Sequence, residues 1–125
     1  MKLAFPTDYG KTISAHFGRA PFFVVADIQN DGGVTYERRD KAYHGSQMEH
    51  DHNREGHSGL HQGMFGVITD CQVLIAGGMG QPAFEHAQEA SLSVILTGEK
   101  DIQTAVGLFQ ENKLASDPRR VHTHR

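Results

Sequence analysis

The chain of 125 residues contains a single cysteine, Cys71. One cysteine excludes an intramolecular disulfide framework, and it excludes a four-cysteine zinc or iron–sulfur site within one chain. Free cysteine is among the residue types most often buried, so we expect Cys71 to serve packing.

The chain also lacks an apolar run long enough to span a bilayer, and the short apolar start at 2–5 is stopped by Pro6. Basic residues are not in excess, since 12 Lys and Arg accompany 15 Asp and Glu for a formal net charge of −3. A general nucleic-acid binder needs a basic face that displaces counterions, so this class is not favoured. We expect a soluble, cytoplasmic protein that binds neither membranes nor nucleic acids.

The apolar segments that are present predict an α/β protein. With 38% hydrophobic and 22% charged residues, the composition is globular, and the length suits one domain. Strands are expected at 2–5, 21–27, 34–38, 71–78 and 91–97, and the turn-forming QNDGG makes a hairpin of the second and third. Helices are expected over 58–68, after Pro82 and after Asp101, which can cap the last one. This order predicts a mixed five-stranded sheet with about three helices.

Histidine is unusually abundant, with nine residues in the chain. Five of them fall within 44–61, namely His44, His50, His52, His57 and His61. This segment is polar and has no apolar periodicity, which indicates a loop inserted in the domain. Its imidazoles are interleaved with carboxylates and could bind Zn²⁺, Ni²⁺ or Cu²⁺, whereas a solvated insertion without metal is the alternative. The PRRVHTHR ending indicates a flexible tail over 116–125, so the domain is expected to span 1–115.

A glycine-rich turn, GGMGQP at 77–82, joins an expected buried strand to an expected helix. Free backbone N–H groups at a helix start favour an anion, and ligands of such sheets bind at the carboxyl ends of strands. The structural alternative is a tight turn that needs glycine at positive φ. A dinucleotide site is not supported, because no third glycine follows Gly78 and Gly80 at the spacing of that fingerprint.

Three segments together resemble one protein family. TISAHFGRAPFFVV (12–25) is similar to its ISxHFGRAPxF signature, VLIAGGMGQPAFE (73–85) to its AGGMG element, and VGLFQENKL (106–114) to its last helix. Over about residues 1–115 the chain resembles the dinitrogenase iron–molybdenum cofactor carrier family, which includes small stand-alone members. The resemblance implies a ribonuclease H-like fold, for which we expect the strand order 3-2-1-4-5, and binding of anionic metal–sulfur clusters. The histidine-rich segment lies outside the matching motifs and inherits nothing from them.

The resemblance also suggests site residues. His16, the histidine of the HFG element, is implied as a cluster ligand. Arg19 offers a fork of donors for an anionic cluster, and a surface ion pair is its structural alternative. Met79 either turns its thioether to the cluster or fills a gap in the core. With Gly78 and Gly80 these residues make up the expected cluster-binding set, and we expect the loop at 7–19 to lie beside the turn at 77–82.

Two functions follow as expectations. The first is non-enzymatic carriage of an iron–sulfur or molybdenum-containing cluster between donor and acceptor proteins, in cofactor assembly or storage. A preassembled cluster brings its own sulfide, which fits the scarcity of cysteine. The alternative is a Zn, Ni or Cu buffer or chaperone that acts through the histidine-rich segment. A nuclease, suggested by fold analogy alone, is rejected because it needs carboxylates that converge on the central strands. The first strand offers only Asp8, just beyond its end, and Asp70 falls just before the strand at 71–78.

Overall fold

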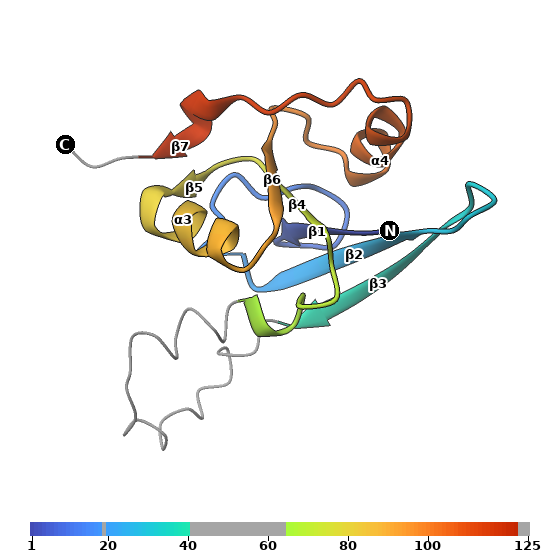
Figure 1. Cartoon of the computed structure of the whole chain (residues 1–125), viewed down its shortest axis with the longest axis horizontal. Coiled ribbons are helices and arrows are strands. Elements are labelled where there is room, and N and C mark those ends of the chain that lie inside the picture. Colours follow the sequence, from blue (N-terminus) through green and yellow to red (C-terminus); the bar gives the residue numbers. More distant parts are fainter. Residues whose placement is uncertain (19, 41–64, 123–125) are drawn as a thin grey trace, which may run out of the picture.

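The computed structural model describes residues 1–18, 20–40 and 65–122 (Figure 1). Its main sheet has five strands in the order β3-β2-β1-β4-β6. Their bounds are β1 Lys2–Thr7, β2 Phe22–Ile28, β3 Val34–Asp40, β4 Val73–Ala76 and β6 Ser93–Leu96. The first three strands pair antiparallel, whereas β4 runs parallel to β1 and β6 parallel to β4. The α/β class with a mixed five-stranded sheet is therefore confirmed, and the ribonuclease H-like assignment stays a prediction.

The strand order differs from the expected 3-2-1-4-5 in its last number. A two-residue strand, β5 (Met79–Gly80), follows β4 along the chain and lies outside the main sheet, so the edge strand is β6. β5 pairs in parallel with another two-residue strand, β7 (Val121–His122). The sequence does not predict β5, because a glycine-rich segment of this kind indicates a turn and its partner lies more than 40 residues further on.

Strand β1 continues through Pro6, beyond its predicted end at residue 5. Its register with β4 is at Leu3 and Ala4, so Pro6 lies past that pairing and its missing N–H removes no bond to β4. The carbonyl of Pro6 instead accepts the N–H of Ser14 at 2.8 Å, which turns the following loop back over the end of the sheet.

Two helices cover opposite faces of the sheet. The first, α3 (Gln81–Glu89), packs with the cluster that contains Phe23 and Leu74, and the second, α4 (Ile102–Gln110), with the cluster that contains Val24 and Ile75. Consecutive strand residues thus enter different clusters, as the alternation of side chains along a strand requires.

The helix after Asp101 forms as predicted, with the Asp101 carboxylate accepting the N–H of Thr104 at 2.9 Å. Pro82 lies in the first turn of α3, also as predicted. The helix expected over 58–68 falls largely outside the described residues. In the described part, 65–66 are helical and 67–70 form a turn, because the glycine at 66 and the return to β4 end the helix early.

Part of the segment expected as a flexible tail over 116–125 carries short secondary structure in the described residues. Pro118–Arg120 form a 3₁₀ turn, η2, before β7 pairs with β5. The N–H of Asp117 also donates to the carbonyl of Leu96 at 2.8 Å, next to the end of β6. These are backbone bonds to distant parts of the chain, which a polar and aperiodic sequence does not reveal.

Candidate functional site

The loop after β1 and the turn after β4 lie side by side, as predicted. The N–H of Gly77 donates to the carbonyl of Ser14 at 3.1 Å, and the N–H of Phe17 donates to the carbonyl of Gly78 at 3.3 Å. Because β1 and β4 are parallel neighbours, both segments leave the sheet at the same edge. This edge carries the carboxyl ends of the strands, where ligands bind in sheets of this kind.

A glycine at position 77 makes this approach possible. A Cβ added to Gly77 would lie 2.9 Å from the carbonyl oxygen of Ser14 and 3.0 Å from the Cα of Ala15. Neither Gly77 nor Gly80 has a positive φ. The alternative prediction, a tight turn that needs glycine at positive φ, is therefore wrong for these two residues. Gly77 is needed because backbone passes directly over it.

His16 projects from this loop with an exposed side chain. Its backbone is held on both sides, since its N–H donates to Ser14 Oγ at 3.0 Å and its carbonyl accepts the N–H of Ala20 at 3.1 Å. The next residue, Phe17, is 1% exposed and stacks on Phe65 with ring centroids 5.5 Å apart. A fixed backbone therefore presents an imidazole to solvent, where its nitrogens can ligate a metal.

The other described residues of the predicted cluster-binding set are less exposed than His16. Met79 is 1% exposed and belongs to the core cluster with Phe17, so its side chain fills the core, one of the two roles left open. Gly78 is buried and Gly80 is partly buried, and both bring backbone to the site. Arg19 and the five histidines of 44–61 lie outside the described residues.

The start of α3 borders the same turn. Gly80 is its N-cap residue and provides no side-chain acceptor, and Pro82 has no N–H to donate. The first N–H groups of the helix are therefore not capped by a side chain, and the helix dipole favours negative charge there.

Cys71 and the two carboxylates considered from the sequence, Asp8 and Asp70, do not gather at one end of the sheet. Cys71 is buried, as expected, and burial raises the pKa of its thiol to about 11. Asp8 follows the carboxyl end of β1, whereas Asp70 precedes the amino end of the parallel β4. In residues 1–18, 20–40 and 65–122, no three His, Cys, Asp or Glu side chains are grouped so that they could hold a metal ion.

Asp70 belongs to an ion-pair network that fastens the segment before β4 to the rest of the sheet. Its carboxylate accepts from Arg39 Nη1 at 2.7 Å and from Lys2 Nζ at 2.9 Å, and Arg39 also donates to the carbonyl of Val67 at 2.6 Å. The hydrogen bonds from Arg39, followed by those from Lys2, hold the pKa of the Asp70 carboxyl well below its usual range. Asp70 therefore has a structural role at the opposite edge of the sheet.

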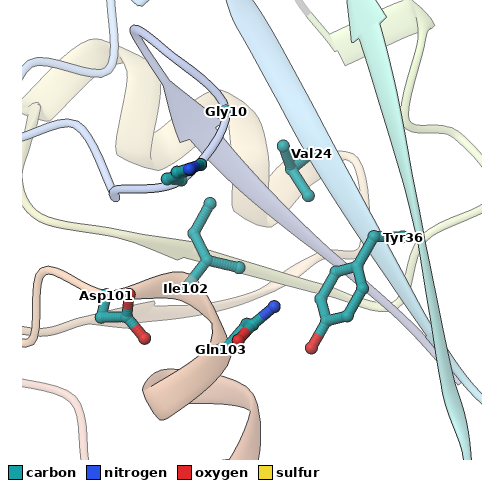
Figure 2. A pocket seen from close by; sticks show the side chains of 7 residues that line it. Gly10, Val24, Tyr36, Asp101, Ile102 and Gln103 are labelled. Carbon is teal, nitrogen blue, oxygen red and sulfur yellow. The ribbon is translucent and has the colours of Figure 1, made fainter.

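A pocket of about 250 Å³ lies on the α4 face, between the start of that helix and strands β2 and β3 (Figure 2). Tyr36 and Gln103 line it together with Asp101, the N-cap residue of α4. Burial, with a smaller contribution from Asp101, raises the pKa of the Tyr36 hydroxyl. Gly10 and Lys11 of the loop after β1 also line the pocket, which lies on the face of the sheet opposite to α3.

The chain matches the family model described as dinitrogenase iron-molybdenum cofactor over residues 1–112. It belongs to this family. No curated protein matches the chain. Within the described ranges, no helix is long and apolar enough to cross a bilayer.

Solved structures agree in fold over nearly the whole chain. The apo form of the orange protein from Desulfovibrio gigas is 23% identical, with 93% of this chain and 92% of that chain covered at a TM-score of 0.65. A candidate dinitrogenase from Methanocaldococcus jannaschii is 17% identical, with 94% of each chain covered at a TM-score of 0.64. At these identities the likeness establishes a common fold.

The sequence patterns miss two parts of the site. Ser14 and Gly77, which join the loop to the turn, lie inside the motifs that carry the family resemblance, so that resemblance could have pointed to them. Arg120, whose guanidinium donates to the carbonyl of Gly77 at 3.4 Å, lies beyond those motifs. No local signal in the sequence marks it.

Proposed function

We propose that the protein carries an anionic metal–sulfur cluster, containing iron or molybdenum, without catalysing a reaction on it. The observation that carries this proposal is the exposed His16 on a fixed loop beside the Gly77–Gly80 turn. Membership of the cofactor family supports the choice of cargo. Carriage implies cytoplasmic donor and acceptor proteins, with cofactor assembly or storage as the context.

The chemistry of the site suits a cluster that arrives assembled. The one cysteine is buried with its pKa raised, so it is a poor source of thiolate at neutral pH. The cluster must then bring its own sulfide ligands, and the protein adds an imidazole and backbone donors. Because the protein contributes only an imidazole and backbone donors, few bonds between protein and cluster have to break when the cluster is transferred to an acceptor.

Anaerobic reconstitution tests the proposal. The purified chain is incubated with iron and sulfide or with tetrathiomolybdate, desalted, and assayed for metal, sulfide and visible absorption. We expect metal and sulfide to be bound together in the ratio of the added cluster or probe, and a loss of at least about tenfold in affinity when His16→Ala removes one ligand. A colourless protein that binds Zn²⁺ or Ni²⁺ but no sulfide would instead favour a divalent-metal buffer.

His86→Gln is the matched control for His16→Ala. His86 lies on α3, one helix turn after Pro82, and its Nδ1 is hydrogen-bonded to the carbonyl of Pro82 at 2.8 Å. Loss of this histidine should leave cluster binding unchanged. Equal losses in the two variants would show that histidine content, and not the loop–turn site, governs binding.

A further inference from the structure

The C-terminal segment brings a guanidinium to the candidate site. Through η2 and β7 the chain returns to β5 beyond the part that the family model matches (Figure 1). Arg120 Nη1 donates to the carbonyl of Gly77 at 3.4 Å, and a Cβ added to Gly98 would lie 2.6 Å from Arg120 Nη2. Gly77 follows β4 and Gly98 follows β6, so the guanidinium lies across the carboxyl ends of two parallel strands.

The donors of this guanidinium are incompletely used within the described part of the chain. Arg120 Nε is buried and has no hydrogen-bond partner there. The nearest carboxylate oxygen, Oδ2 of Asp117, is 3.7 Å from it, which is an ion-pair distance but too long for a hydrogen bond. A buried donor without an acceptor costs free energy, so the hydrogen-bonding capacity of this guanidinium is not fully used by the described part of the chain.

The neighbouring Arg119 differs from Arg120 in its hydrogen bonds and in its exposure. Arg119 Nε and Nη2 donate to the two carboxylate oxygens of Asp117 at 3.0 and 3.2 Å. Its side chain is 88% exposed, against 41% for Arg120. The hydrogen bonds from Arg119 lower the pKa of the Asp117 carboxyl, so this carboxylate is already committed to Arg119. Of the two arginines of η2, Arg120 is the one with capacity for another anion.

We propose that Arg120 is an anion-binding residue of the loop–turn site and contacts the anionic sulfide or oxide face of the cargo. The inference rests on the proposed function, since it names a further residue of the same site. Gly77 is the shared element, because its N–H binds the loop of His16 and its carbonyl binds Arg120. A cargo beside the turn would meet an imidazole from one segment and a planar fork of donors from the other.

The test is an anaerobic titration of the full apo chain with tetrathiomolybdate, a small anionic metal–sulfur probe, followed by visible absorption. Arg120→Gln removes the fork and should weaken binding about tenfold, the value of one charge-assisted hydrogen bond. Lys113→Gln removes the same formal charge from an exposed side chain outside the site and should change affinity less than about twofold. Thermal unfolding of each variant checks that the fold is retained.

Gly98→Ala provides an independent variant that keeps every charge. The added methyl group must displace the end of the Arg120 side chain, and Gly98 has no positive φ that would strain an alanine. We expect it to weaken binding as Arg120→Gln does, although less, and to add little to the loss in the double variant. A full additional loss in the double variant would mean that Gly98→Ala acts by another route, and would count against the proposal.

A parallel titration with molybdate separates this inference from the proposed function. If the unaltered chain binds tetrathiomolybdate and Arg120→Gln binds it equally well, the role of Arg120 is overturned and cluster carriage stands. If molybdate binds through Arg120 but tetrathiomolybdate does not bind, the anion site stands and carriage of a molybdenum–sulfur cargo fails. If neither probe binds the unaltered chain, the role of Arg120 and the carriage of a molybdenum–sulfur cargo are both overturned.

Discussion

The backbones of Gly77 and Ser14 meet so closely that the N–H of one binds the carbonyl of the other at 3.1 Å, with no room for a Cβ between them. Together with the hydrogen bond from the N–H of Phe17 to the carbonyl of Gly78, this contact joins the two segments on which the candidate site depends. It explains why a glycine follows β4 without any requirement for positive φ. The position of His16 relative to the turn is thus set by backbone contact.

Gly77→Ala should therefore damage both stability and binding. The methyl group would meet the Ser14 carbonyl at 2.9 Å, and backbone cannot move aside as a flexible side chain can. We expect a loss of about 1–3 kcal/mol in the free energy of unfolding, as for other overpacked sites. Urea denaturation measures this loss, and the tetrathiomolybdate titration should show weakened binding in the fraction that remains folded.

Gly107→Ala is a control that should raise the free energy of unfolding, whereas Gly77→Ala should lower it. Gly107 lies within α4, and a Cβ there would meet no heavy atom outside the local helix backbone within 4 Å in the described part of the chain. Alanine should raise the free energy of unfolding by about 0.5–1 kcal/mol, because glycine is a poor helix former. Destabilisation by both alanines to the same extent would contradict the special role of the Gly77 contact.

Met79 should behave as a core residue and not as a cluster ligand. Met79→Leu conserves volume and removes the thioether, so it should cost less than about 1.5 kcal/mol and leave cluster affinity unchanged. Met79→Ala should cost about 2–5 kcal/mol, because the side chain is almost completely buried. A Met79→Leu variant that keeps its stability but loses cluster binding would instead assign the sulfur to the site.

Much of the fold could be predicted because local patterns report it directly. The apolar runs of β1, β2 and β4 mark buried strands, and Asp101 is a capping residue at the start of an apolar period. The same patterns do not predict β7, because a strand of two residues with polar neighbours is too short to show an alternation of apolar and polar residues. Its pairing with β5 depends on contacts between residues more than 40 positions apart.

The candidate site was predictable to the extent that motifs carry it. The HFG and GGMG elements place His16 and the turn at one edge of the sheet, since they follow parallel neighbouring strands. Sequence alone cannot decide whether Met79 faces the site or the core, because a methionine suits both. Arg120 is missed for a different reason, namely that its relation to Gly77 exists only once the C-terminal segment has folded back.

The Arg39–Asp70 pair should make stability depend on pH in the acid range. The pKa of Asp70 is lower in the folded chain than its usual value of 3.8, and hydrogen bonds from Arg39 are the largest cause. The stabilisation is therefore fully present above pH 3.8 and is lost as the pH falls through the lower, folded-state value. Since the Asp70 side chain is 44% exposed, solvent screening limits the gain to about 1 kcal/mol.

Asp70→Asn tests this pH dependence against Asp8→Asn, a change at an exposed carboxylate beyond the end of β1. At pH 7, Asp70→Asn should lower the free energy of unfolding by about 1 kcal/mol, because the amide cannot form the ion pairs with Arg39 and Lys2. Below pH 3.8 the difference from the unaltered chain should shrink, because the Asp70 carboxyl takes up a proton in the unfolded chain there while the folded chain still keeps its charge. Urea denaturation between pH 7 and pH 3 follows both variants. A constant difference across this range would show that Asp70 stabilises the fold through neutral hydrogen bonds and not through its charge.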